Sequence, residues 1–270
     1  MQRRSSNGFR ELYRQAWDEL RILRASYPEM KPEFTPVLVF GRSMTARVAT
    51  AGLNPSESEF LDEAKKPFRG DRQRFLHWKP GDLTEGLIAE AFRRSEGYFN
   101  LGNAYGKWFD LHDEFLEALR HTFATGEACH TDYVSPFVTS GGISNFEHIH
   151  GKRALGQQGL RYWVQVLGLC PHVEVIFGHG RGWNDVQEQR LFGITEWEVI
   201  ETPFDNKGLR QFLPPLKFAT GKLPNGGRPV LVYWWRPNRN GSPLCNLNPD
   251  DRTVLGKIIR KHARQRGHLQ

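Results

Sequence analysis

The stretch Val48-Ala-Thr-Ala-Gly-Leu-Asn-Pro-Ser56 decides which fold the chain is expected to adopt. Its first four residues are small or apolar and predict a short buried strand that leads into a polar turn. Gly52 permits close backbone approach, and Pro55 fixes φ and cannot continue a hydrogen-bonded ladder. Open α/β sheets bind ligands where the carboxyl ends of their strands pass into loops. Asn54 is therefore our first functional candidate, and a plain Asn-Pro turn is the alternative.

Strands and helices alternate along the rest of the chain. Apolar runs predict four central strands and two shorter ones, at residues 47–53, 129–137, 173–178 and 230–235, and at 37–40 and 197–202. Apolar residues at helical spacing predict helices over 7–25, 83–94, 108–123 and 146–169, the last bent or broken near its glycines, and a C-terminal helix starting at Asn248. This alternation is typical of a mostly parallel sheet covered on both faces. We expect an α/β fold, a three-layer α/β/α sandwich with a central, mostly parallel four-stranded sheet.

The length of the chain allows one large domain or two small ones. The chain has 270 residues, of which 39% are hydrophobic. We expect a single domain over residues 1–270, with an N-terminal helical extension (about 1–35) and an insertion (about 181–227). No apolar run reaches the roughly 18 residues that span a bilayer, and no apolar segment follows the first arginines as in a secretory signal. The three cysteines lie far apart, which argues against a metal site or disulfide framework. We therefore expect a cytoplasmic protein, nucleoid-associated if bacterial.

The charge balance indicates the kind of partner. The net charge is +7 and the sequence pI is about 9.4, which favours a polyanion, nucleic acid above all. Basic residues cluster at 65–74, 236–239 and 252–266. The first two clusters adjoin loops that we expect to carry chemistry. For the third cluster, a solvated helix face is an equally good explanation.

The loop Arg236-Pro-Asn-Arg-Asn-Gly-Ser-Pro-Leu244 follows the strand at 230–235. Backbone amides and the Ser242 hydroxyl in such a loop can hold a phosphate. A basic loop with an apolar tip also suits a wedge that enters the base stack of DNA, and Leu244 would be that tip. The alternative is a surface loop with a buried leucine.

These stretches resemble the motifs of a known family. Gly52-Leu-Asn-Pro-Ser56 resembles the first motif of the uracil-DNA glycosylase superfamily and is closest to the G-x-N-P-G form of its mismatch-specific and single-strand-selective branches. Asn240-Gly-Ser-Pro-Leu244 resembles the second motif, H-P-S-P-L or N-P-S-G-L. Lys66-Pro67-Phe68 falls where those branches carry an aromatic ring that stacks on the flipped base, and Gln73-Arg74-Phe75 resembles the N-R-F that follows. Thr131-Asp132 stands where the family has an asparagine that reads the base edge.

The resemblance extends over roughly residues 45–260 and implies a function. The chain would be a monofunctional DNA glycosylase that flips a pyrimidine out of DNA and hydrolyses its N-glycosidic bond, leaving an abasic site. It would act as a monomer on single- or double-stranded DNA, without a metal or other cofactor. Asn54 would orient the attacking water, and Asn240 would donate a hydrogen bond to the departing base. The register of the second motif leaves Asn238 as a rival to Asn240.

The resemblance also assigns the remaining contacts. The residues that would contact the base are Leu53, Phe68 and Asp132, and those that would contact the DNA are Ser56, Arg236, Arg239, Ser242 and Leu244. An amide such as that of Asn54 does not take up a proton near neutral pH. One of three nearby acids could therefore supply the missing carboxylate: Glu57, Glu59 or Asp62.

Asp132 departs from the family pattern, because an ionised aspartate only accepts hydrogen bonds whereas an asparagine also donates them. An acceptor suits the N4 amino group of cytosine. This residue therefore points toward cytosine or a modified cytosine, as in phage DNA, and away from plain uracil. Repair and antiviral defence both stay open as roles. In the alternative, Asp132 faces a neighbouring amide or arginine and reads no base.

Two rival functions predict different features. A hydrolase or nucleotide-binding protein of this fold class would need a G-x-S-x-G, P-loop or G-x-G-x-x-G motif after a strand, and the sequence has none. A non-catalytic DNA-binding module that retains the glycosylase fold would bind DNA without releasing a base. His179 also falls at the end of a predicted strand, where a core or surface histidine is the simpler interpretation.

Overall fold

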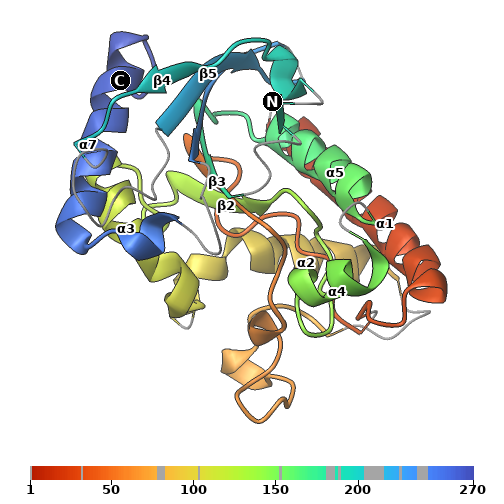
Figure 1. The fold of residues 1–270 in the computed structure, drawn as a ribbon. Coiled ribbons are helices and arrows are strands. Elements are labelled where there is room, and N and C mark those ends of the chain that lie inside the picture. Colours follow the sequence, from red (N-terminus) through yellow and green to blue (C-terminus); the bar gives the residue numbers. More distant parts are fainter. Residues whose placement is uncertain are drawn as a thin grey trace. The chain divides into compact units, whose positions relative to one another are not determined.

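The described residues form a mixed α/β fold around a six-stranded sheet with the strand order β2-β1-β3-β6-β5-β4. The computed structural model describes residues 2–31, 33–77, 83–102, 104–151, 154–180, 186–187, 190–203, 216–224, 227–235 and 243–270. The strands, labelled where there is room in Figure 1, are β1 Val48–Gly52, β2 Ala128–Asp132, β3 Val175–His179, β4 Glu198–Ile200, β5 Leu216–Lys222 and β6 Pro229–Trp235.

Most of the strand pairing is parallel, as the sequence predicts. β1 pairs with β3 and β3 with β6 in parallel, whereas β5 is antiparallel to both β6 and β4. The expected four-stranded sheet is wrong in number, because β4 and β5 extend it beyond β6. Both come from the stretch 181–227, which we expected to be an insertion. In β5 the buried and exposed residues partly alternate, as in a half-covered strand.

The helices overlap the predicted ranges. They are α1 Gln2–Ser26, α2 Glu85–Glu96, α3 Gly106–Leu119, α4 Ile143–His150, α5 Gly156–Leu169 and α7 Pro249–Gln265. Helix α1 begins five residues earlier and α3 ends four residues earlier than predicted. Asn248 caps α7 as expected: its side chain accepts a hydrogen bond from the Asp251 N–H at 2.8 Å, and Pro249 occupies the first turn. Within the described ranges, none of the helices is both long and apolar enough to cross a membrane.

The chain divides into two compact units, each built from three segments. Unit 1 comprises residues 1–44, 52–105 and 130–171, and unit 2 comprises residues 45–51, 106–129 and 172–270. The boundary crosses β1 just before its last residue, Gly52, and crosses β2 between Cys129 and His130. Unit 1 therefore holds the residues that follow these two strands.

One prediction for unit 1 is confirmed and one is corrected. The stretch 146–169, predicted as a helix bent or broken near its glycines, is broken: it belongs to two helices, α4 and α5, and α4 ends before Gly151, whose φ of +90° cannot continue a helix. Residues 37–40 are buried but do not form a strand. Phe40 alone forms an isolated bridge with His130, and Val37 donates instead to the Pro136 carbonyl at 2.8 Å. Helices α1 and α5 of this unit run side by side (Figure 1).

In unit 2, glycines let the elements approach closely. A Cβ atom on Gly178 of β3 would lie 2.2 Å from the Trp234 ring of β6, so only glycine fits beneath this tryptophan. A Cβ atom on Gly256 of α7 would lie 2.4 Å from the Phe115 carbonyl oxygen of α3. Helix α7 therefore packs directly on the backbone of α3, with Leu255 and Ile259 buried.

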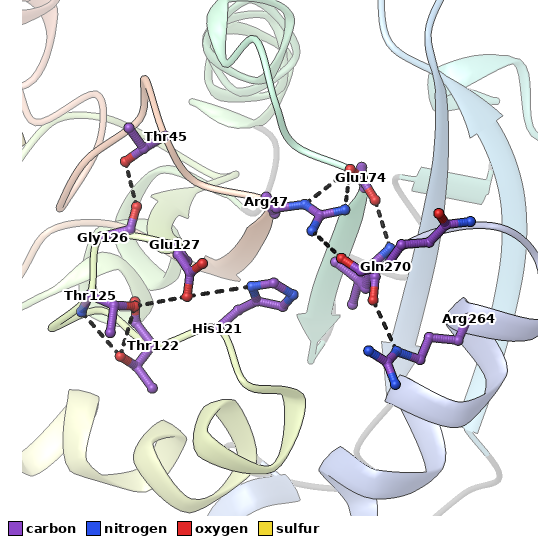
Figure 2. Close-up of polar contacts among 11 residues, drawn as sticks. Thr45, Arg47, His121, Thr122, Thr125, Gly126, Glu127, Glu174, Arg264 and Gln270 are labelled. Atoms are coloured by element: carbon purple, nitrogen blue, oxygen red, sulfur yellow. Dashed lines mark hydrogen bonds and ion pairs between the residues drawn. The ribbon is translucent and has the colours of Figure 1, made fainter.

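A closed polar cluster lies at the amino end of β1, as Figure 2 shows. Arg47, just before β1, forms an ion pair with Glu174, just before β3, at 2.7 Å. The other oxygen of Glu174 accepts a hydrogen bond from the Leu269 N–H at 2.7 Å, and Arg47 also donates to the Gln270 carbonyl at 2.9 Å. Because these groups satisfy one another, we interpret the cluster as structural. At the carboxyl end of β2, by contrast, Oδ2 of Asp132 has no hydrogen-bond partner among the described residues.

Candidate active site

Strand β1 lies between β2 and β3, and the chain reaches β2 on one side of it and β3 and β6 on the other. Its carboxyl end is thus where the winding of the sheet changes direction, the usual binding position in open α/β sheets. Residues 53–56 follow there, as the sequence predicts. The candidate site lies entirely within unit 1.

The side chains of His130 and Asp132 lie directly over Gly52. They lie two positions apart on β2, so their side chains leave the same face of the strand. Nε2 of His130 is 3.5 Å from Oδ1 of Asp132, and both side chains are almost fully buried. A Cβ atom on Gly52 would lie 2.6 Å from that Oδ1 and 2.7 Å from that Nε2. The glycine of the first motif therefore leaves the space that these two side chains occupy.

The loop after β2 holds the end of β1 in place. The Tyr133 N–H donates to the Gly52 carbonyl at 3.0 Å, and the Val134 and Ser135 N–H groups donate to the Leu53 carbonyl at 3.0 and 3.2 Å. A Cβ atom on Gly159 of α5 would lie 1.6 Å from the Val134 carbonyl oxygen, so α5 supports this loop from behind. The turn that carries Asn54 is thus tied to β2.

Asn54 is held through its amide nitrogen. Nδ2 donates to the Pro55 carbonyl at 3.0 Å and to the Phe137 carbonyl at 3.4 Å. Neither bond uses the side-chain oxygen Oδ1, and the residue is partly exposed. Oδ1 therefore keeps its capacity to accept a hydrogen bond, for example from a water molecule.

The carboxyl group of Asp132 is buried and incompletely hydrogen-bonded. The residue is 7% exposed, and its Oδ2 has no hydrogen-bond partner among the residues that the structure describes. Leaving a buried carboxylate oxygen without a donor is costly, because water no longer solvates it. The arrangement suits a ligand that brings an N–H group to Oδ2.

Glu59 is the acid that interacts electrostatically with Asp132. It lies in the short 3₁₀ helix Glu57–Glu59 and is only 3% exposed. Burial raises the pKa of Glu59 to about 7; the Tyr98 hydroxyl and Arg74 oppose this rise, and the charge of Asp132 adds to it. A second buried carboxyl group thus adds to the raised pKa of Glu59, and Glu59 changes its charge near neutral pH.

A hydrogen-bonded chain connects Glu59 to the outer part of the site. The Tyr98 hydroxyl accepts the Tyr105 N–H at 2.9 Å and donates to Oε2 of Glu59 at 2.6 Å. Arg74 donates to the same Oε2 at 3.4 Å, and its guanidinium lies 5.0 Å from the ring centroid of Phe68. Phe68 is partly exposed, and its N–H donates to the Phe60 carbonyl at 3.0 Å. Arg74 thus lies against both the buried acid and the ring expected to stack on a base.

The other acids near Asn54 have local partners. Glu57 forms ion pairs with Lys31 and Lys65, each at 3.8 Å. Asp62 accepts a hydrogen bond from the Lys66 N–H at 2.8 Å. The Ser56 hydroxyl accepts the Ser58 N–H at 3.2 Å and caps the 3₁₀ helix. Of the three acids that the sequence leaves open, Glu59 is therefore the one that interacts with Asp132.

The expectation of an exposed wedge at Leu244 is wrong. This side chain is fully buried in the short 3₁₀ helix Pro243–Asn246, which lies just before α7. The Leu244 carbonyl accepts a hydrogen bond from Arg252 at 3.1 Å. The alternative, a buried leucine, is the observed state. The remaining predicted residues of this loop lie outside the described residues: Arg236, Asn238, Arg239, Asn240 and Ser242.

His179 ends β3 in unit 2 and packs among aromatic rings. Its ring centroid is 5.4 Å from that of Trp108 and 6.1 Å from that of His112. It is 6% exposed. The simpler interpretation of this residue, a core histidine, is what the structure contains.

Sequence reasoning missed two residues of the site. His130 lies two residues before Asp132 on a strand, so the two-residue period of the strand could have identified it. Tyr98 lies 39 positions from Glu59 and carries no local signal of this contact. Within the described ranges, no three His, Cys, Asp or Glu side chains gather in a way that could hold a metal ion.

Comparisons with known proteins add no assignment. No protein-family model matches the chain, and no curated protein matches it.

Proposed function

We propose that this protein is a monofunctional DNA glycosylase that flips a pyrimidine out of DNA and hydrolyses its N-glycosidic bond. The substrate is cytosine-like, such as a modified cytosine of phage DNA, with uracil as the alternative. The observation that carries the proposal is the buried Asp132 carboxylate, which lies beside Gly52 and whose Oδ2 has no hydrogen-bond partner among the described residues. We also propose that the fold is the three-layer α/β/α sandwich that the sequence predicts.

The hydrogen-bonding capacity of the Asp132 carboxylate supports the choice of base. A carboxylate oxygen accepts hydrogen bonds, and the N4 amino group of cytosine donates them. His130 lies against the other oxygen, at 3.5 Å from Oδ1. A flipped cytosine would thus satisfy the buried oxygen that the free protein leaves without a described donor. A large part of the cost of extracting the base from the stack would be offset in this way.

Asn54 and Glu59 support the hydrolytic step. Cleavage of the N-glycosidic bond develops positive charge on the sugar, which a nearby negative charge stabilises. Asn54 would orient the attacking water through Oδ1, because its Nδ2 is already bonded to two carbonyl groups. Glu59, in its ionised form, would supply the negative charge that an amide lacks. Phe68, which lies against Arg74, would stack on the extruded base.

A base-release assay tests this function. Purified protein would be incubated with single-stranded and duplex oligonucleotides that carry uracil, thymine opposite guanine, hypoxanthine, 5-hydroxymethylcytosine or glucosylated hydroxymethylcytosine, and abasic sites would then be cleaved with alkali. Asn54→Ala is the active-site variant. Asn145→Ala is the matched control, because Asn145 is exposed on α4.

The two functions give different results. Release of one base by the wild type and by Asn145→Ala, lost or reduced at least about 100-fold in Asn54→Ala, would establish a glycosylase; losses of this size are usual when a positioned catalytic group is removed. Binding of DNA without release of any base, equal in the wild type and Asn54→Ala, would favour the non-catalytic module instead.

A further inference from the structure

Helix α7 presents a row of positive charge on its solvent-exposed side. Lys257, Arg260, Lys261 and Arg264 are spaced i, i+3, i+4 and i+7, so they share one helical face. Lys257, Lys261 and Arg264 are exposed, and Arg260 is partly exposed. Arg120 is exposed and directly follows α3. We call these five residues the α7 basic face.

The packing of α7 determines which residues face outward. Leu255, Ile259 and Ala263 are buried, and Gly256 lies against the α3 backbone. Because the apolar side of the helix is thus fully used, the basic side must point outward. This orientation is a consequence of the core and does not depend on the charges themselves.

The α7 basic face is not neutralised within the described part of the chain. None of its five residues forms an ion pair there. The two arginines that flank it do: Arg252 of α7 pairs with Glu114 at 3.3 Å, and Arg266, which follows the last residue of α7, pairs with Glu198 at 3.4 Å. Acidic residues on α3, among them Asp110 and Glu117, form no ion pair with the face either.

The cations crowd one another. Partial burial, together with the positive charges of Arg120 and Arg264, lowers the pKa of the Arg260 guanidinium. Arg120 itself adopts a left-handed conformation with φ of +63°, which is uncommon for a residue with a side chain. Clustered like charges without counter-charges are unfavourable in the free protein, and an anionic partner relieves this repulsion.

We infer that the α7 basic face binds the phosphate backbone of a nucleic acid, independently of base sequence. The row from Lys257 to Arg264 extends about 10 Å along the helix axis, enough to meet consecutive phosphates of a nucleic acid strand. A membrane-binding helix would also need exposed apolar side chains. The exposed large apolar residues of the described chain, Ile22, Ile149 and Val199, all lie outside α7. This inference does not rest on glycosylase activity.

The salt dependence of DNA binding tests the inference. Fluorescence anisotropy would measure the affinity of the full chain for a short random-sequence duplex over a series of KCl concentrations. The test variant is Lys257→Gln, Arg260→Gln and Lys261→Gln together; Arg264 is kept because its Nε donates to the Leu269 carbonyl at 3.2 Å. The control variant, Arg21→Gln, Arg93→Gln and Arg161→Gln together, removes the same charge from arginines that have acid partners.

Each lost phosphate contact reduces the slope of log affinity against log salt by about 0.9. The test variant should therefore lose about two to three units of slope, and the control variant should keep the wild-type slope. Circular dichroism and thermal unfolding would verify that both variants fold. Equal slopes for the wild type and the test variant, or no binding by the wild type, would overturn the inference.

One further measurement completes the test. Vesicles containing phosphatidylserine would be offered to the wild type and the test variant. Loss of vesicle binding in the test variant with unchanged DNA binding would assign the face to a membrane and contradict our inference. The salt slope is measured on binding alone, so failure of the glycosylase proposal would leave this result unaffected.

Discussion

Gly52 and Asp132 share a space that admits only one side chain: a Cβ atom on Gly52 would lie 2.6 Å from Oδ1 of Asp132. Real Cβ atoms are essentially never so close to a carboxylate oxygen. The position of the Asp132 carboxyl group therefore depends on a glycine at the carboxyl end of β1. This relationship connects the first sequence motif to the residue expected to read the base.

Replacement of Gly52 by alanine should displace Asp132 and His130. We expect Gly52→Ala to lower base release at least tenfold, because a misplacement of about 1 Å can cost a site that much or more. Unfolding in urea would measure the stability of the same variant. In a background that carries His130→Ala and Asp132→Ala, the same substitution should cost less stability, with a coupling of about 1 kcal/mol or more. Equal costs in the two backgrounds would contradict the steric relationship.

Asp132→Asn should change which base is released. An amide keeps the size of the side chain but both donates and accepts hydrogen bonds, so it suits uracil better than a carboxylate does. We expect the ratio of uracil to cytosine-type release to rise about tenfold or more, since a specific base contact contributes roughly 1 to 3 kcal/mol of discrimination. Single-turnover assays on paired oligonucleotides would measure this ratio. An unchanged ratio would mean that Asp132 does not read the base.

Glu59 should make the stability of the fold depend on pH. Its pKa is about 7 in the folded chain and near 4.5 in an unfolded one, so the folded state binds more protons between these values. The contribution of Glu59 to the free energy of unfolding is therefore most favourable at low pH and falls as the pH rises from 4.5 to 7. Urea unfolding of Glu59→Gln at pH 5 and pH 8 should show the variant gaining up to about 3 kcal/mol relative to the wild type.

Glu57→Gln is the matched control for that measurement, because Glu57 lies in the same short helix but faces Lys31 and Lys65. The gain at high pH should be absent in this variant. A stability difference between Glu59→Gln and the wild type that is equal at both pH values would refute the buried, raised-pKa state of Glu59.

The rate of base release should also follow the ionisation of Glu59. If the carboxylate form stabilises the positive charge on the sugar, the wild-type rate should rise about tenfold between pH 6 and pH 8, since a group with a pKa of about 7 goes from mostly protonated to mostly ionised over this range. Glu59→Gln should be slower at pH 8 and show no such rise. A wild-type rate that falls over this range would instead assign Glu59 the role of a proton donor.

Much of the local structure could be predicted from the sequence. The short apolar run before Gly52 predicts β1, and Asn248-Pro-Asp-Asp predicts the start of α7; both are confirmed. These features depend on side-chain periodicity and capping, which neighbouring residues encode. The stretch 37–40 has the same apolar character as a strand yet makes only one bridge, because the pairing of a strand depends on a distant partner.

The candidate site shows the same limit. Asn54, Asp132 and Phe68 could be selected because short motifs contain them, and Glu59 because it follows Asn54 closely. The roles of these residues were harder to predict from the sequence. Only the structure separates Glu59 from Glu57, since burial beside Tyr98 cannot be inferred from the spacing of the acids. Leu244 had the right residue type for a wedge, but its side chain is buried just before α7.

The sequence by itself determined the strand and turn around Gly52, the approximate positions of the helices, the start of α7 at Asn248, and the net positive charge. The reason is that propensity, periodicity and turn chemistry act between residues a few positions apart. Tertiary structure alone decided that β4 and β5 extend the sheet, that Asp132 and His130 occupy the space above Gly52, and that Tyr98 meets Glu59 from 39 positions away. These contacts form because folding brings distant segments together and removes water from between them, and the same desolvation raises the pKa of Glu59.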